Sequence, residues 1–370
     1  MSKTFPAERH FAEPERSWTL AAPYYFEPEI YRRELDRIFY RSWNFVCHEE
    51  LVREPGAYTT FRIGNQNILV TRGKDGVLRA FHNVCQHRGH ELLKGSGKTP
   101  VIICPYHAWS YRTDGTLRTA RGTQDMPDFD PKDFGLRPVQ VELFCHFVYI
   151  NMDPKAPALA GQTGHLEQEL RTYTPEIDKL THARRLEWEI KANWKNTVDN
   201  FLECFHCNVA HPAFAELVDM PTYRSKTYGI WSSHIGDAGK PDSAAFTYER
   251  RANEPGFAAW WLWPNLTIFV MPGCPNFITF QMIPTGPETT REVMDFYLSS
   301  PVPTEMEEAA IRYANDTLNP EDISVVESVQ RGLHSLGYRQ GRYVVDKERS
   351  EKSEHALHHF HGLILDALAR

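Results

Sequence analysis

The sequence lacks a long apolar segment. No stretch of its 370 residues approaches the roughly 18 consecutive apolar residues of a membrane-spanning helix, and the opening MSKTFPAERHFAEPERSW has no apolar run typical of a signal peptide. Positive charge is not in excess either, because 41 basic residues face 48 acidic ones and the formal net charge is −7. These absences predict a protein without a membrane span and without a basic surface for nucleic acid or anionic lipid.

Cysteine is scarce and odd in number, which argues against a disulfide framework. With no export signal, this composition predicts a cytoplasmic protein whose thiols stay reduced. Cysteines that stand beside histidines in such a protein are candidates for metal ligands. The seven cysteines are Cys47, Cys85, Cys104, Cys145, Cys204, Cys207 and Cys274.

Hairpin signals mark a β-rich segment in the first half of the chain. A stretch with helical periodicity, 26–43, precedes it. Short β-rich runs then alternate with turn dipeptides such as Gly64-Asn65. We therefore predict a small all-β domain over 48–153.

The rest of the chain mixes strands and helices. Alternating runs over 221–300 are typical of an antiparallel sheet, and helical periodicity follows over 304–336 and in the C-terminal tail. We predict an α+β protein in which 154–370 form a second domain. The arm and helix of 1–47 are expected to pack with that second domain.

The stretch NWKNTVDNFLECFHCNVAH suggests a helix that ends in a metal site. Glu203 and His206 share a helical face, and Asp199 lies on the same face one turn earlier. On a continuous helix, His211 would be rotated from His206 by roughly 140°. The two imidazoles can therefore converge only if the helix distorts or ends between them, which Pro212 favours. Two histidines and a carboxylate with open positions form the ligand set of non-haem Fe(II) oxygen chemistry.

Other interpretations of this stretch remain open. Two histidines and a glutamate on a helix are often ordinary surface or core residues. Cys204 and Cys207 also form a C-x-x-C pair, which is typical of redox or zinc sites.

A second cluster of ligand types lies in the predicted β domain. It consists of Cys85-Gln-His87 and Cys104-Pro-Tyr-His107, both placed after predicted strands. Two thiolates on one iron and two imidazoles on the other are the ligands of a Rieske [2Fe–2S] centre. A tetrahedral zinc site is the alternative, although C-x-H is an unusual spacing for zinc.

These motifs resemble the oxygenase component of the Rieske non-haem iron oxygenases. The resemblance rests on NVCQHRGHELLKGSGK with ICPYHAWSYRTDG for the cluster, and on NWKNTVDNFLECFHCNVAHP for the iron. Within the family, the chain is most similar to the carnitine monooxygenase branch, which cleaves quaternary ammonium compounds. The resemblance implies a Rieske domain joined to a helix-grip catalytic domain. It also implies a homotrimer, O2 as co-substrate and a separate NAD(P)H-dependent flavin and iron–sulfur reductase.

The resemblance further implies a late carboxylate as the third iron ligand beside His206 and His211, and the sequence offers Asp322. We predict that the helical segment 304–336 is split here, with Asn319 as the N-cap and Pro320 as the first residue of the second piece. The alternative is that Asp322 only stabilises the first turn of that helix.

Glu203 then has a different role. In the family, an acidic residue before the first iron histidine bridges two subunits, so Glu203 would connect His107 of one chain to His206 of the next. Asp199 and Asn200 would support the iron histidines.

The implied reaction hydroxylates a carbon next to a quaternary ammonium nitrogen, after which the C–N bond breaks, with carnitine or a related betaine as substrate. Such a cation favours a cage of aromatic rings. The expected cage residues, each equally suited to an ordinary core, are Phe205, Tyr228, Trp261 and Trp263.

Three alternatives remain. The first is an aromatic-ring hydroxylase or an O- or N-demethylase of the same superfamily. The second is a plain Rieske electron carrier, which would need only 48–153. The third is a zinc-binding interaction module without redox chemistry.

Overall fold

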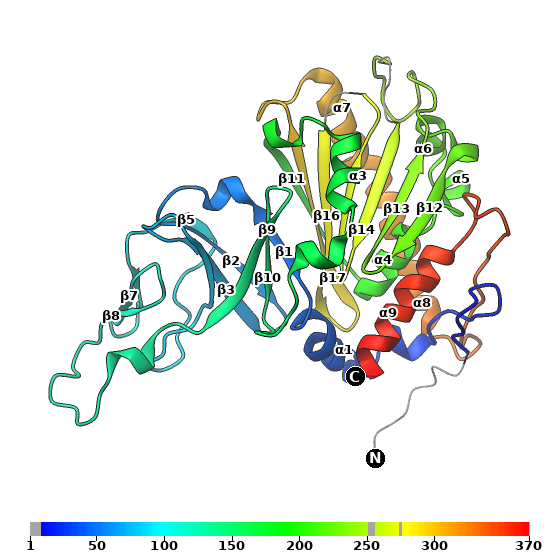
Figure 1. Cartoon of the computed structure of the whole chain (residues 1–370). Coiled ribbons are helices and arrows are strands. Elements are labelled where there is room, and N and C mark those ends of the chain that lie inside the picture. Colours follow the sequence, from blue (N-terminus) through cyan, green and yellow to red (C-terminus); the bar gives the residue numbers. More distant parts are fainter. Residues whose placement is uncertain (1–8, 251–255, 274–275, 370) are drawn as a thin grey trace. The chain divides into compact units, whose positions relative to one another are not determined.

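The fold is described from a computed structural model that covers residues 9–250, 256–273 and 276–369 (Figure 1). Contacts divide the chain into two compact units, one of residues up to Ile38 together with Gln162 onward, and one of Phe39–Gly161. Each unit is described by itself. In the covered ranges, none of the helices has the length and apolar character needed to cross a bilayer.

The unit Phe39–Gly161 is built on antiparallel strands. A seven-stranded sheet has the order β1-β10-β9-β4-β3-β2-β5, and a three-stranded sheet has the order β6-β7-β8. The strands are β1 Asn44–His48, β2 Ala57–Ile63, β3 Gln66–Arg72, β4 Leu78–His82, β5 Ser96–Lys98, β6 Ile102–Ile103, β7 Ser110–Tyr111, β8 Leu117–Thr119, β9 Pro138–Phe144 and β10 Phe147–Asn151.

One hairpin turn lies where the sequence predicted it, whereas the unit is longer than predicted. Strands β2 and β3 pair up to Ile63 and Gln66, so Gly64-Asn65 is the predicted two-residue turn. The unit extends beyond the predicted 48–153 at both ends, because β1 pairs with β10. The indole of Trp43 also donates to the Pro157 carbonyl at 2.9 Å.

The other unit contains one seven-stranded antiparallel sheet of order β11-β17-β16-β15-β14-β13-β12. Its strands are β11 Thr181–Ile190, β12 Arg224–Tyr228, β13 Trp231–Gly236, β14 Phe257–Leu262, β15 Leu266–Val270, β16 Asn276–Gly286 and β17 Thr289–Leu298. The helices are α1 Pro28–Glu34, α3 Leu166–Tyr173, α4 Trp194–Phe201, α5 Cys207–Ala210, α6 Pro212–Leu217, α7 Glu305–Tyr313, α8 Asn319–Leu333 and α9 His355–Ala369, while α2 Leu159–Thr163 crosses the division between the units.

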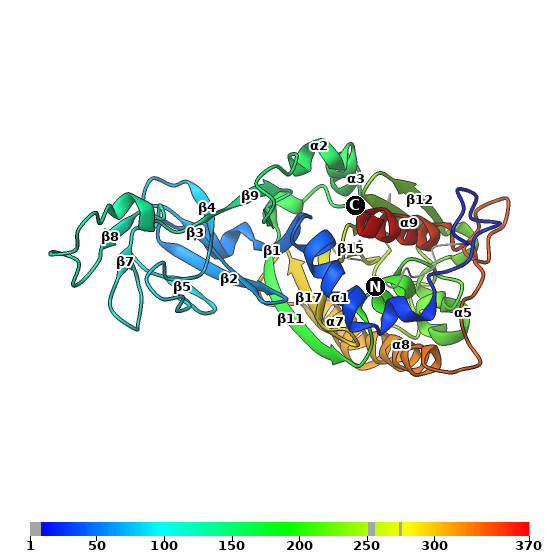
Figure 2. The same cartoon turned by 90° about the horizontal axis from the view of Figure 1, so that it is seen from below.

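Helices cover both faces of this sheet. Figure 2 shows α3 and α8 on opposite sides of it. Strand β14 explains the arrangement, because neighbouring side chains in a strand point to opposite faces. Trp260 donates to Glu169 of α3 at 3.1 Å, whereas Phe257 and Ala259 line a cavity together with residues of α4 and α8. The α+β class predicted from the sequence is confirmed.

Two predicted helices differ in detail. The helix expected over 26–43 ends in a π-helical turn at Leu35–Phe39, since the chain then enters β1. The break expected at Asn319-Pro320 is wrong, because a π-helical turn, Ala314–Leu318, joins α7 to α8. Asn319 therefore has helical dihedral angles (φ −67°, ψ −39°) and cannot act as the predicted N-cap.

A buried ion pair connects the N-terminal helix to α4. The Lys195 ammonium lies 2.6 Å from a carboxylate oxygen of Glu34, and both side chains are fully buried. The second oxygen of Glu34 accepts a hydrogen bond from the indole of Trp194 at 2.9 Å. Asn193 accepts from the same ammonium at 2.8 Å.

We expect Lys195→Met to destabilise this unit by about 3–5 kcal/mol, because it leaves the Glu34 carboxylate buried without a cation. Calorimetry should show a lower Tm, and the double variant Lys195→Met/Glu34→Leu should recover most of the loss. Lys240→Met, which removes an exposed pair with Glu216, is the control and should cost less than about 1 kcal/mol. An unchanged Tm for Lys195→Met would contradict the assignment.

Candidate metal centres and active-site pocket

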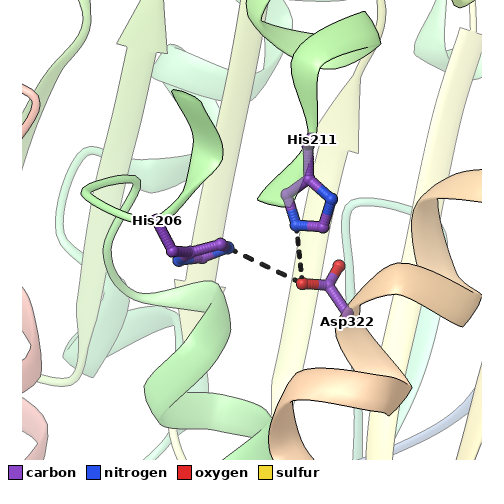
Figure 3. A group of neighbouring side chains, drawn as sticks. All are labelled: His206, His211 and Asp322. Atoms are coloured by element: carbon purple, nitrogen blue, oxygen red, sulfur yellow. Dashed lines mark hydrogen bonds and ion pairs between the residues drawn. The ribbon is translucent and has the colours of Figure 1, made fainter. Parts of the chain in front are cut away.

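Three predicted iron ligands lie together in the catalytic unit (Figure 3). One ligand atom from each of His206, His211 and Asp322 lies within 4.8 Å of the others. A carboxylate oxygen of Asp322 lies 2.8 Å from Nε2 of His211 and 3.6 Å from Nε2 of His206. The two imidazoles and the carboxylate thus face a common point, as a two-histidine, one-carboxylate iron site requires.

The path of the chain explains how the histidines converge. Helix α4 ends at Phe201, and His206 stands directly before the short helix α5. His211 lies between α5 and α6 with a non-helical φ of −127°, and Pro212 begins α6. The helical face predicted for Glu203 and His206 is wrong, because α4 ends before both residues. The predicted interruption between the two histidines is confirmed, since the short helix α5 ends at Ala210, directly before His211.

The third ligand reaches the site from α8. Gln330 on α8 is buried, and its side-chain oxygen accepts hydrogen bonds from the backbone N–H of Asn193 at 2.9 Å and the side-chain amide of Asn196 at 2.7 Å. These bonds fix α8 against the start of α4. Asp322, near the first turn of α8, is thereby held opposite the histidines.

Two further carboxylates orient the histidines. Glu203 lies 2.5 Å from Nδ1 of His206, and Glu321 lies 2.7 Å from Nδ1 of His211. Each carboxylate accepts a hydrogen bond from the Nδ1–H of its histidine, which leaves the Nε2 lone pair free for a metal. Sequence reasoning gave Glu321 no role. Its position beside Asp322 was the available signal, because a metal-bound histidine needs a partner for its second nitrogen.

The electrostatics of the cluster fit a bound cation. Burial alone would lower the pKa of His206, but Asp322 and Glu203 raise it to about 10. Burial likewise opposes a net rise in the pKa of His211, and both histidines together hold the pKa of Asp322 below its usual range despite its burial. Positive charge is therefore favoured between the two imidazoles and the Asp322 carboxylate, at the position that a divalent cation would take.

Of the two residues predicted to support the iron histidines, Asn200 lies beside them and Asp199 does not. The side-chain amide of Asn200 lies 3.4 Å from Nε2 of His206, beside the ligand cluster. Asp199 does not contact either iron histidine. It accepts instead from the Tyr25 hydroxyl at 2.6 Å and lies 3.0 Å from Nε2 of His361, so its expected support of the histidines is replaced by a buried network with α9.

The C-x-x-C pair is a disulfide in the structure. Cys204 and Cys207 are bonded to each other, which corrects the expectation that disulfides are absent. Because they are separated by only three positions, in the connection from α4 to α5, the two sulfurs can meet without long-range contacts. The pair does not form the alternative zinc site, and Cys274 lies outside the described residues.

Two matching loops carry the predicted cluster ligands in the β-rich unit. Cys85 and Cys104 each donate their N–H to the carbonyl five residues later, at 2.8 Å in both loops. The rings of His87 and His107 lie 4.7 Å apart. The loops thus bring two thiols and two imidazoles together, which is the donor set of a Rieske centre.

Several contacts in these loops fit a bound cluster. Both thiols are buried, and within the described chain Nδ1 of His107 is buried without a hydrogen-bond partner. Such a nitrogen is costly unless a ligand satisfies it. The hydroxyl of Tyr111 lies 3.3 Å from Sγ of Cys85 and accepts from the N–H of Gln86 at 2.9 Å. Hydrogen bonds of this kind to a cluster sulfur tune the reduction potential.

A cavity of about 100 Å³ adjoins the iron ligands. Its walls are mainly apolar and aromatic, and they come from α4, α8 and the central strands. The lining residues are Thr197, Asn200, Phe201, Glu203, Cys204, His206, Cys207, His211, Phe214, Tyr223, Phe257, Ala259, Phe269, Met271, Phe280, Glu292, Met294, Ala314, Leu318, Asn319, Asp322 and Val326.

The four aromatic residues expected to form the cage do not line this cavity. Trp261 and Trp263 both pack around Phe360 of α9, with ring centroids 5.2 and 6.2 Å away. Tyr228 stacks on Trp231 at 4.1 Å, and Phe205 is 42% exposed. The four residues expected in the cage therefore lie away from this cavity, and other aromatic residues line it. Strand periodicity gave the face of each residue but not which helix covers it.

Comparison with known proteins identifies the family. A model of the Rieske [2Fe-2S] domain matches residues 42–130, and a model of the ring hydroxylating alpha subunit (catalytic domain) matches residues 177–370. The chain belongs to the Rieske non-haem iron oxygenases. Its cofactors are accordingly a Rieske [2Fe–2S] cluster and a mononuclear iron, its co-substrate is O2, and its electrons come from a reductase partner.

Individual relatives are similar to this oxygenase along nearly the whole of its chain. The carnitine monooxygenase oxygenase subunit of Escherichia coli K12 is 39% identical, with 96% of each chain covered. The chloroplastic choline monooxygenase of Beta vulgaris is 34% identical over 96% of this chain and 78% of its own. A solved quaternary ammonium Rieske monooxygenase, described for carnitine oxidation and inter-subunit electron transfer, is 38% identical with a TM-score of 0.91, covering 96% and 97% of the two chains.

We expect Glu321→Gln to weaken Fe(II) binding at the mononuclear site by about 10–100-fold, because the variant removes the charge that holds the Nδ1 proton of His211. Iron per chain, measured after dialysis against a weak chelator, should fall while acid-labile sulfide stays constant. Glu327→Gln on the same helix is the matched control, since Glu327 binds the N–H of Lys191 instead of a histidine. Equal iron retention in both variants would contradict the role of Glu321.

Proposed function

We propose that this oxygenase hydroxylates a carbon next to a quaternary ammonium nitrogen, with carnitine or a related betaine as substrate. The similarity to carnitine monooxygenase along the whole chain carries the proposal. The aromatic lining of the cavity beside the iron ligands supports it, because aromatic faces attract ammonium groups.

Different residues of the chain would hold the iron, orient its ligands and enclose the substrate. Bound iron would activate O2 with electrons from the reductase, and His206, His211 and Asp322 would hold that iron while leaving positions open. Glu203 and Glu321 keep the Nδ1 protons in place, so the ligand nitrogens stay available. The apolar cavity wall limits water beside the substrate. Once hydroxylated, the carbon next to the cationic nitrogen forms a carbonyl as the C–N bond breaks and an amine leaves.

We further propose that electrons cross between subunits of a homotrimer through Glu203. One oxygen of Glu203 lies 2.5 Å from His206, and the other accepts from the backbone N–H of Phe205 at 2.5 Å. The side chain keeps 13% of its surface exposed, so a partner chain can reach it. His107 of the next subunit would then be the donor. The partner reductase would be an NAD(P)H-dependent flavin and iron–sulfur protein, and a cytoplasmic location stays a prediction.

The test of the reaction is substrate-dependent oxygen uptake by the iron-loaded protein with a reductase. L-Carnitine, γ-butyrobetaine, glycine betaine and choline form the panel, together with one aromatic methyl ether. We expect uptake with a quaternary ammonium compound and an equal amount of amine released. Uptake only with the aromatic ether would favour the O-demethylase alternative, and formaldehyde without release of trimethylamine would favour N-demethylation.

The test of the bridge is Glu203→Gln. Because Glu203 also holds the Nδ1 proton of His206, the variant is loaded with excess Fe(II) before the assay. The amide keeps the size of the side chain but loses its charge, so in the fully loaded protein we expect single-turnover electron transfer to slow by about a hundredfold or more, the scale of losing about 3 kcal/mol from a barrier. Iron content and the Rieske absorption spectrum check assembly. Wild-type transfer rates in Glu203→Gln trimers, or a monomer with full activity, would overturn the bridge.

A further inference from the structure

The cavity beside the iron ligands contains an acidic side chain that the metal site does not use. Glu292 lies on β17 and lines the cavity, as does Met294 two residues later on the same face. Only 4% of Glu292 is exposed. The other charged residues of the lining are the iron ligands and Glu203, which is paired with His206.

Glu292 has no cationic partner among the described residues. Its one hydrogen bond comes from the side-chain amide of Asn319, at 3.1 Å. A buried carboxylate is costly unless a positive charge or several hydrogen bonds compensate it. Burial accordingly raises the pKa of Glu292 to about 8, and the nearby charge of Asp322 adds to the rise. The cavity thus holds an acidic side chain whose charged form lacks a counter-charge among the described residues.

A structural role alone does not explain a carboxylate at this position. The bond to Asn319 helps to fix the start of α8, but it needs only an acceptor oxygen, which glutamine would supply at lower cost. A negative charge is needed only if something positive occupies the cavity. No lysine or arginine lines the cavity in the part of the chain that the structure describes.

The aromatic walls around Glu292 also fit a positively charged ligand, and in particular a quaternary ammonium group. A fully methylated ammonium group cannot donate an N–H hydrogen bond, so it is recognised through its charge and through aromatic faces. The six aromatic residues of the lining come from α4, α6, the residue before β12, and strands β14, β15 and β16. They are Phe201, Phe214, Tyr223, Phe257, Phe269 and Phe280.

We propose that Glu292 is the counter-ion for the substrate's ammonium group and is the residue that makes this oxygenase select cations. The inference rests on the proposed function and names the recognition element of that site. Because no basic side chain lines the described cavity, the carboxylate of a betaine would have to extend out of it. The cationic end of the substrate is the end that lies beside the iron ligands.

The experiment measures anaerobic binding to the iron-loaded protein by calorimetry. The probes are the quaternary ammonium compounds of the panel, together with 3,3-dimethyl-1-butanol, in which carbon replaces the nitrogen of choline and removes the charge. The readout is the ratio of the Kd of this neutral probe to the Kd of the tightest cation. This ratio does not depend on the fraction of active protein.

We expect Glu292→Gln to weaken binding of the cation at least tenfold and to leave the neutral probe within twofold, with iron per chain unchanged. Glu189→Gln is the matched control, because it removes the same charge from an exposed position on the neighbouring strand β11. That control should keep the wild-type ratio. Glu292→Asp, which retains a carboxylate, should keep most of the preference for cations and serves as the second variant if Glu292→Gln folds poorly.

The outcomes separate the inference from the proposed function. If the wild-type protein binds none of the cations, the proposed function fails and the inference fails with it. If the wild-type protein prefers cations and Glu292→Gln keeps that preference with full iron, only the role of Glu292 is overturned. A lost preference in Glu292→Asp equal to that in Glu292→Gln would also overturn it, because the effect would then not follow the charge.

Discussion

The iron site depends on the docking of α8 against α4, which one buried amide controls. The side chain of Gln330 makes four hydrogen bonds: it accepts from the backbone of Asn193 and the side chain of Asn196, and it donates to the carbonyl of Tyr25 and to Glu288. All its donors and acceptors are thus used on fixed partners. Because Asp322 on α8 is far in sequence from the two histidines that follow α4, this contact between α8 and the start of α4 helps to hold Asp322 opposite them.

Negative charge surrounds the resulting site. Glu203 and Glu321 lie behind the histidines, Asp322 lies between them, and Glu292 faces the adjoining cavity. In a buried environment this arrangement is stable only when cations balance it. Iron held by the histidines and Asp322 would supply positive charge beside the first three carboxylates, and a cationic substrate would favour the ionised form of the fourth. Metal retention and substrate choice therefore depend on the same local electrostatics, although different residues control them.

Much of this could be predicted from local patterns. The spacing around Cys85 and Cys104 indicated the Rieske loops, and the spacing of His206 and His211 with Pro212 indicated a broken helix, because both depend on neighbours in sequence. Patterns failed where distant segments decide. Asn319 was expected to cap a helix but lies inside one, since a π-helical turn continues α7 into α8. Trp261 and Trp263 were expected beside the substrate but pack on α9.

The sequence by itself determined the donor types, the two-domain plan and the family, because ligand spacings and hairpin turns are local properties that the order of residues specifies. The tertiary structure alone decided which carboxylates support the histidines, which rings line the cavity and where an uncompensated charge lies. Glu321 and Glu292 look like any other acidic residues in the chain. Their roles arise only because packing excludes water from them and places one beside His211 and the other beside the cavity.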